Sequence, residues 1–147
     1  MVTTTKTLLG NDYLGWVESA TAGTYNYLAG QGTLSETRNQ TAIDTSDKTT
    51  DGYDTEAFGN IKVSYSLDIK VKLPDPDGYT RLETQCNAKV PFNFQVRKGG
   101  KAGLLADAIF AALMNGTIAS RTFNKDGTVD AKITLSLAAA PTVDQLA

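Results

Sequence analysis

The chain has 147 residues, a formal net charge of −2 and 41% hydrophobic residues, which is the length and composition of one globular domain. Because basic residues are not in excess, the composition excludes a protein that grips a nucleic-acid backbone through a strongly cationic surface. The chain contains no histidine, which removes the commonest general base near neutral pH and the imidazole ligand of most zinc sites. A single cysteine, Cys86, excludes an internal disulfide.

The N-terminal segment does not have the pattern of a signal peptide. Residues 1 to 7 lead into only Leu8 and Leu9 before a polar Gly-Asn-Asp sequence. No apolar stretch approaches the roughly 20 residues that a membrane-spanning helix needs. We therefore expect a protein that assembles in the cytoplasm and has no membrane partner.

Two short strands are predicted near the start, at 13–18 and 25–28, because a loop-like Ser-Ala-Thr-Ala-Gly-Thr segment separates them. A long polar stretch follows from Thr33 to Thr55, in which the apolar residues are Leu34, Ala42, Ile43 and Tyr53. Such a stretch contributes little to a core, and a loop of this length in a compact domain is either functional or disordered. We favour a partner-binding arm.

The clearest element runs from Ile61 to Leu73, where apolar and polar residues alternate as in a half-buried strand. A Pro-Asp-Pro-Asp-Gly turn ends it, and a short helix is predicted at about 79–88, with Asp75 and Asp77 favouring its N-terminus. A second alternating strand is predicted at 91–98. The core face of the first strand is expected to contain Ile61, Val63, Tyr65, Leu67, Ile69 and Val71.

The apolar run from Leu104 to Met114 is ambiguous, because its alanines and leucines favour a helix whereas an unbroken apolar run is also typical of a buried strand. We favour the strand. The pair Asn115-Gly116 indicates a hairpin turn leading into 117–123. A further turn at 124–127 precedes a third alternating strand at 129–137. The result is one mainly β domain over residues 1–147.

No pattern in the sequence indicates catalysis, a metal site or a cofactor. Cys86 lies at helical spacing from Leu82 and Tyr79 and is interpreted as a packing residue. Gly99-Gly100-Lys101 lacks the spacing of a phosphate-binding loop. Trp16 and the tyrosines near it are interpreted as packing residues, because few cations accompany them.

Three segments in chain order resemble the major tail tube proteins of long-tailed bacteriophages. They are Tyr27-Leu28-Ala29-Gly30-Gln31-Gly32-Thr33-Leu34, Ala42-Ile43-Asp44-Thr45-Ser46-Asp47-Lys48 and Gly52-Tyr53-Asp54, followed by the alternating strand. The resemblance spans most of the chain and depends on the combination and order of these segments. It implies a tail-tube fold of the β-sandwich or barrel type, with one short flanking α-helix and a long inter-strand loop.

The resemblance also implies a function without catalysis. Such subunits form stacked, hexameric rings in the virion tail, which surround a tape-measure protein, meet tail-terminator and distal tail proteins, and conduct DNA without binding it specifically. The loop 33–55 would contact the neighbouring ring, strands beside it would line the lumen, and the segments 1–11 and 138–147 would be further arms. The implied assembly residues are Thr37, Arg38, Asn39, Gln40, Ile43, Asp44, Thr45, Ser46, Asp47, Lys48 and Tyr53.

Two alternatives stay open at this point. A tail-terminator or head-tail connector protein would form one ring that does not stack. A β-sandwich module that binds carbohydrate or a receptor would need exposed aromatic residues on loops, and Tyr53 and Phe58 are the candidates in or next to the long arm.

Overall fold

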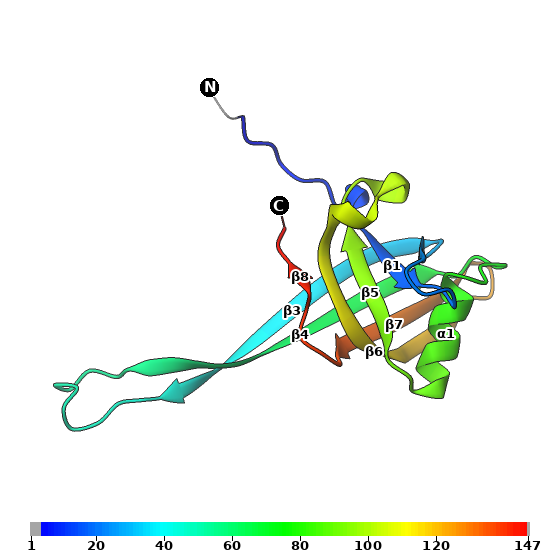
Figure 1. Cartoon of the computed structure of the whole chain (residues 1–147). Helices are drawn as coiled ribbons and strands as arrows, with labels where there is room; N and C mark the ends of the chain where they lie inside the picture. Colours follow the sequence, from blue (N-terminus) through cyan, green and yellow to red (C-terminus); the bar gives the residue numbers. More distant parts are fainter. Residues whose placement is uncertain (1–3, 147) are drawn as a thin grey trace.

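The computed structural model describes residues 4–146, and its elements are mainly β-strands (Figure 1). The strands are β1 (Leu14–Glu18), β2 (Tyr25–Tyr27), β3 (Gln31–Asp44), β4 (Glu56–Lys70), β5 (Phe92–Arg97), β6 (Ala108–Phe123), β7 (Val129–Leu137) and β8 (Val143–Asp144). One α-helix, α1 (Tyr79–Ala88), and the 3-10 turns η1 (Gly10–Asp12), η2 (Gly100–Ala102) and η3 (Leu105–Asp107) complete the described part.

All strands belong to one antiparallel sheet in the order β2-β1-β5-β6-β7-β4-β3, and β8 pairs with β6. The long strand β6 divides the sheet into two layers, because its first half pairs with β5 and β8 whereas its second half pairs with β7. We call β2, β1, β5, β8 and the first half of β6 the body layer. The wall layer consists of β3, β4, β7 and the second half of β6.

The hydrophobic core lies between these two layers. The ring of Tyr65 on β4 lies 5.7 Å from Phe94 on β5 and 4.9 Å from Phe110 on β6, measured between ring centroids. Inward-facing residues of β7, including Ile133 and Leu135, are fully buried. The predicted β-sandwich or barrel fold with one flanking helix is therefore confirmed, with a single strand passing from one layer to the other.

A glutamine side chain joins the layers at the opposite edge. The amide of Gln31 on β3 accepts a hydrogen bond from the backbone N–H of Gly15 and donates one to its carbonyl oxygen, both at 2.8 Å. Gly15 lies on β1, which has no ladder with β3. The Gln31 side chain thus takes the place of a strand pairing and holds the start of β3 against the body layer.

Several predicted elements are confirmed closely. The strands at 92–97 and 129–137 and the helix at 79–88 lie where the sequence places them. Asp75 accepts a hydrogen bond from the backbone N–H of Tyr79 at 3.0 Å, which stabilises the first turn of α1 as expected. With ten residues, α1 is far shorter than a membrane-spanning helix, and residues 4–146 contain no helix with the length and hydropathy of one.

Of the apolar run 104–114, residues 108–114 form a strand, as favoured, whereas Leu105–Asp107 is a 3-10 turn. The predicted hairpin turn at Asn115-Gly116 is wrong. β6 continues through both residues to Phe123, and Gly116 pairs with Leu135. A Cβ atom at Gly116 would lie 2.7 Å from the sulfur of Cys86 and 2.8 Å from the ring of Phe92. Glycine is therefore needed here for close packing of α1 and β5 onto β6, and no turn forms.

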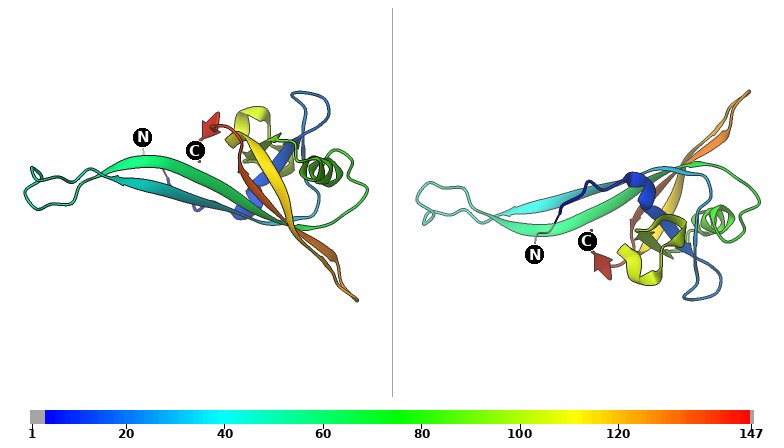
Figure 2. Two further views of the ribbon diagram at one scale, coloured as in Figure 1. Left: turned by 90° about the horizontal axis from the view of Figure 1, so that it is seen from below. Right: turned by 90° about the horizontal axis from the view of Figure 1, so that it is seen from above.

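The predicted loop from Thr33 to Thr55 is also corrected. β3 extends to Asp44 and β4 starts at Glu56, so only residues 45–55 form a loop, and the rest is a long β-hairpin (Figure 2). Threonine has a high strand propensity, and pairing with β4 satisfies the backbone of this polar stretch. The first alternating strand consequently runs over 56–70 instead of 61–73, and Ile61, predicted in the core, is 50% exposed.

Candidate assembly surfaces

The hairpin of β3 and β4 projects far beyond the two layers, and we call its outer part, residues 40–61, the arm (Figures 1 and 2). The predicted assembly residues lie in the arm or in the adjoining part of β3, residues 36–39, which we call the root of the arm. Thr37, Arg38, Asn39, Gln40, Ile43 and Asp44 are on β3, and Thr45, Ser46, Asp47, Lys48 and Tyr53 are in the loop at its tip. All of them except the half-buried Ser46 are exposed.

Hydrogen bonds between polar side chains and the backbone shape the tip of the arm. The hydroxyl of Ser46 accepts a hydrogen bond from the backbone N–H of Thr55 at 2.7 Å, and the carboxylate of Asp47 accepts from the N–H of Thr49, also at 2.7 Å. Hydrogen bonds from the hydroxyl and the N–H of Thr49 lower the pKa of Asp47, and the N–H of Ser46 does the same for Asp44. The tip is thus a hydrogen-bonded turn and not an unstructured segment.

Large apolar side chains are exposed on both faces of the arm. Phe58, which is 88% exposed, is directly opposite Ala42, whereas the next pair along the ladder is Ile43 with Ala57. Successive pairs in a ladder point to opposite faces, so Phe58 and Ile43 are exposed on different sides. The arm also carries five carboxylates and one lysine, a net charge of −4, whereas the whole chain has −2.

The root of the arm is tied to the C-terminal segment. The guanidinium of Arg38 contacts the carboxylates of Glu36 and Asp144, which raise its pKa. The hydroxyl of Tyr65 donates a hydrogen bond to Glu36 at 2.9 Å, and burial together with this carboxylate raises the pKa of Tyr65. Asp144 belongs to β8, so one cluster of side chains links β3, β4 and β8.

The two terminal segments, which were expected to be arms, differ in structure. Residues 4–9 extend from the domain without regular structure and are exposed. The segment 138–146 instead lies along the first half of β6, where the N–H of Thr142 donates to Ala111 and that of Gln145 to Ile109, both at 2.8 Å. It covers the β6 edge that β7 leaves unpaired. Residues 1–3 and 147 lie outside the described part.

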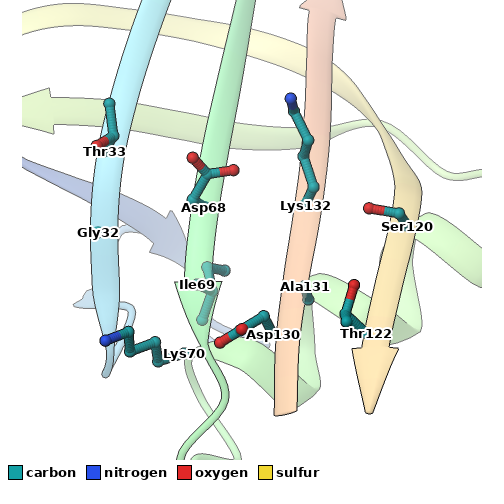
Figure 3. A pocket seen from close by; sticks show the side chains of 10 residues that line it. All are labelled: Gly32, Thr33, Asp68, Ile69, Lys70, Ser120, Thr122, Asp130, Ala131 and Lys132. Atoms are coloured by element: carbon teal, nitrogen blue, oxygen red, sulfur yellow. The ribbon is translucent and has the colours of Figure 1, made fainter. Parts of the chain in front are cut away.

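The outer face of the wall layer is polar, and we call it the polar wall; Figure 3 shows the part of it around Asp68, Lys132 and Asp130. Its residues share rows across the ladder, for example Asn115, Ser136, Ser64 and Thr37. A shallow depression of about 430 Å³ lies at the end of this face next to the β6–β7 turn, where Lys70, Thr122 and Asp130 line it. The polar wall comprises Thr33, Ser35, Thr37, Asn39, Lys62, Ser64, Ser66, Asp68, Lys70, Asn115, Thr117, Ser120, Thr122, Asp130, Lys132, Thr134 and Ser136.

The wall layer has an unpaired strand edge on each side. β3 is the last strand of the sheet, so one edge of its 14 residues has no strand beside it in the part of the chain that the structure describes. On the other side, β5 stops opposite Met114, and residues 115–123 of β6 have no strand on that side within 4–146. No local pattern indicated this second edge, because Asn115-Gly116 predicted a turn there.

The outer face of the body layer has different chemistry. The guanidinium carbon of Arg97 lies 4.5 Å from the ring centroid of Trp16 and 5.1 Å from that of Tyr25. Trp16 packs edge-on against Tyr27, which confirms its interpretation as a packing residue. Gln95 and Arg97, the polar residues that alternate with the apolar ones in β5, are buried, because this aromatic cluster covers them.

The residue types considered for metal or ligand binding lie apart in the described residues. Between 4 and 146 there is no group of three His, Cys, Asp or Glu residues placed to hold a metal ion. Cys86 is buried against β6, and burial raises the pKa of its thiol to about 11. The aromatic residues considered for ligand binding, Tyr53 and Phe58, lie on the arm, separate from each other along the hairpin.

Several solved structures share this fold. The tail of an empty GTA particle with C6 symmetry matches with a TM-score of 0.76 and 19% identity over 93% of this chain and 98% of that chain. The SPP1 tail tube matches with a TM-score of 0.67 and 14% identity over 95% of this chain and 81% of that chain. A chain from the virion of a native gene transfer agent gives 0.66 and 18% over 92% and 97%.

No protein-family model matches the sequence, and no curated protein is similar to it in sequence. The identities to the solved structures are low, so these matches concern the fold. The chain has the tail tube fold, as the resemblance of its sequence segments predicted.

Proposed function

We propose that this chain is the structural subunit of a phage tail tube, in which copies form rings of six that stack into a hollow cylinder. The observation that carries the proposal is the wall layer, which has two unpaired edges and one uncovered polar face. The tail tube fold supports it, and the C6 symmetry of the GTA tail supports the number of six.

Ring formation follows from the unpaired edges. The strands of the wall layer alternate in direction in the order β6, β7, β4 and β3. Because their number is even, the β3 edge of one copy meets the β6 edge of the next copy in antiparallel orientation. Each copy thus repeats the same pairing, and ring closure leaves no edge open to aggregation.

The position of the bulk determines which face lines the lumen. The body layer and α1 both cover the inner face of the wall layer, whereas its outer face is bare (Figure 2). When the wall layers of several copies close into a ring, the bulky bodies fit only on the outside. The polar wall therefore lines the lumen, where the tape-measure protein is enclosed and DNA later passes.

The arm connects successive rings. It projects beyond the ring-forming strands and has exposed apolar residues on both faces, so it is suited to lie between copies and not on a single surface. The exposed segment 4–9 provides a further contact. Tail-terminator and distal tail proteins meet the two ends of the tube, the assembled tube is part of the virion tail, and the subunit has no catalytic activity.

A shortened hairpin tests this proposal. Gln40 and Ile61 are directly paired, so a two-residue Asn-Gly turn can replace residues 41–60 without changing the register. We expect purified wild-type protein to form tubes in negative-stain electron microscopy, and the shortened variant to stay folded by circular dichroism but to form no tubes. Wild-type protein that gave rings without stacking would indicate a terminator or connector, and strictly monomeric protein would overturn the proposal.

A further inference from the structure

The polar wall carries charges of both signs in a regular arrangement. Its charged residues are Lys62, Lys70 and Lys132 together with Asp68 and Asp130, whereas the others are mainly serines, threonines and asparagines. None of the exposed lysines is in the hydrophobic core, and none has an ion pair within 4 Å. Any compensation of these charges must therefore come from neighbouring carboxylates that are not in direct contact with them.

Each aspartate is directly opposite a lysine on the neighbouring strand. Asp68 on β4 pairs with Lys132 on β7, and Lys70 pairs with Asp130 (Figure 3). Directly opposite residues have Cβ atoms roughly 4.5–5.5 Å apart, which is well within the screening length of about 8 Å at physiological ionic strength. The fields of Lys132 and Lys70 are therefore largely offset by these carboxylates, whereas Lys62 is opposite Asn39 and has no carboxylate directly opposite it.

From this arrangement we propose that Asp68 and Asp130 make the lumen wall non-adhesive to duplex DNA. A lysine without a neighbouring carboxylate contacts a phosphate and releases a counterion, which is the main source of non-specific affinity for DNA. Without the two aspartates each subunit presents three lysines, and rings of such subunits form a cationic channel. The hydroxyl and amide groups between the charges keep the wall hydrated without adding to this attraction.

This role explains why the charges are present at all. A wall of serine and threonine alone would be neutral, but exposed lysines and aspartates also oppose the aggregation of a flat, two-edged sheet before the ring closes. Placing the two signs opposite each other retains this benefit while three lysines and two aspartates leave the wall of each subunit a net charge of only +1. The inference rests on the proposed function, because the wall faces DNA only in an assembled tube.

Substitution of Asp68 gives a graded test. This residue is exposed and has no side-chain hydrogen bond within 4–146, whereas Asp130 accepts hydrogen bonds from Thr128 and Asn124 in the β6–β7 turn. Asp68→Asn and Asp68→Lys change the charge of the wall by one and two units. Asp77→Asn and Asp77→Lys are the matched controls, because Asp77 is exposed in the connection to α1 and outside the wall.

Each variant is assembled in the presence of fluorescently labelled duplex DNA, imaged by electron microscopy and sedimented. We expect wild-type and Asp77-variant tubes to retain little DNA, and Asp68→Lys tubes to retain at least about tenfold more. The retained DNA should be lost on adding salt, and the slope of log affinity against log salt concentration should steepen by about 0.9 for each new phosphate contact. Asp68→Asn is expected to lie between, and it carries the test if Asp68→Lys does not assemble.

Two results would overturn the inference. One is equal retention by tubes of the Asp68 and Asp77 variants, and the other is strong retention by wild-type tubes. The absence of wild-type tubes in the same images would instead contradict the proposed function, so the two failures are distinguished by microscopy.

Discussion

β4 passes through two environments. Its second half lies in what we call the body, meaning the two layers together without the arm, whereas its first half belongs to the arm. From Val63 to Ile69 every inward-facing residue is buried, whereas in the outer part Phe58 and Ile61 are exposed. The strand, its pairing with β3 and its alternation continue across the change. What ends at Val63 is the opposing layer, because β5 and β6 do not extend beneath the arm (Figure 1).

An apolar residue in β4 therefore has a different role on each side of Val63. In the body it contributes to folding, since burial of a large side chain stabilises by roughly 1.5–3 kcal/mol. In the arm it contributes nothing to the isolated subunit and is available to other copies. Substitutions in the two regions should therefore separate stability from assembly.

The largest expected effect is that of a charge placed on the core-facing side of β4. Leu67 is fully buried, so Leu67→Lys should lower the free energy of unfolding by more than about 4 kcal/mol and leave the domain mostly unfolded. Lys70→Leu, on the exposed face of the same strand, should change it by less than about 0.5 kcal/mol. Urea titrations followed by circular dichroism compare the two. Equal tolerance would contradict the assignment of the faces of β4.

Two glycines allow a matched comparison of smaller effects. Gly116→Ala would place a Cβ 2.7 Å from the sulfur of Cys86, and this overpacking should cost about 1–3 kcal/mol of body stability. Gly59→Ala would place one 2.5 Å from the carbonyl oxygen of Thr41 in the arm. We expect the second variant to keep the stability of the body and to assemble poorly. If Gly59→Ala were as destabilising in urea as Gly116→Ala, the arm and the body would unfold as one unit.

The sequence was sufficient to predict the elements whose pattern reflects burial on one face. β5, β7 and α1 were placed within a residue or so, because alternation and turn residues bounded them. The core residues Val63, Tyr65, Leu67 and Ile69 followed from the same periodicity, and Val71 packs partly against that core. Where a residue was apolar for a different reason, as Ile61 is in the arm, the pattern predicted burial wrongly.

Other features had no local signal. The polar stretch of β3 resembles a loop because both of its faces are wet, and only the length of β4 reveals its partner. Asn115-Gly116 has the residues of a hairpin turn, but Gly116 is needed by the approach of Cys86 and Phe92, which are distant in sequence. The same holds for the unpaired β6 edge and for Asp144 beside Arg38, since both depend on long-range pairing.

An alkaline pH effect on stability should arise at Cys86, in the core between the two layers. Burial raises the pKa of the Cys86 thiol to about 11 from an ordinary value of 9, so folding favours the protonated form. The resulting stabilisation is complete below pH 9 and is lost as the pH rises from 9 to 11, at a cost of at most about 3 kcal/mol. Cys86→Ala should lack this part of the alkaline loss in urea titrations. Parallel pH profiles for the two proteins would show that the tyrosines account for all of it.

The smallest expected effect concerns the junction between the two regions. Asp144→Asn removes a carboxylate from exposed Arg38 and should change the free energy of unfolding by less than about 1 kcal/mol, because solvent screens such pairs. The pair nevertheless links the short β8, whose backbone pairs with β6, to β3. We expect faster hydrogen exchange at the backbone amides of Thr142 and Gln145, which donate to Ala111 and Ile109, and unchanged exchange in β7. Asp126→Asn, in the exposed β6–β7 turn, is the control. Unaltered protection at both amides would show that backbone pairing alone secures the C-terminal segment, and that the arm root and this segment behave independently.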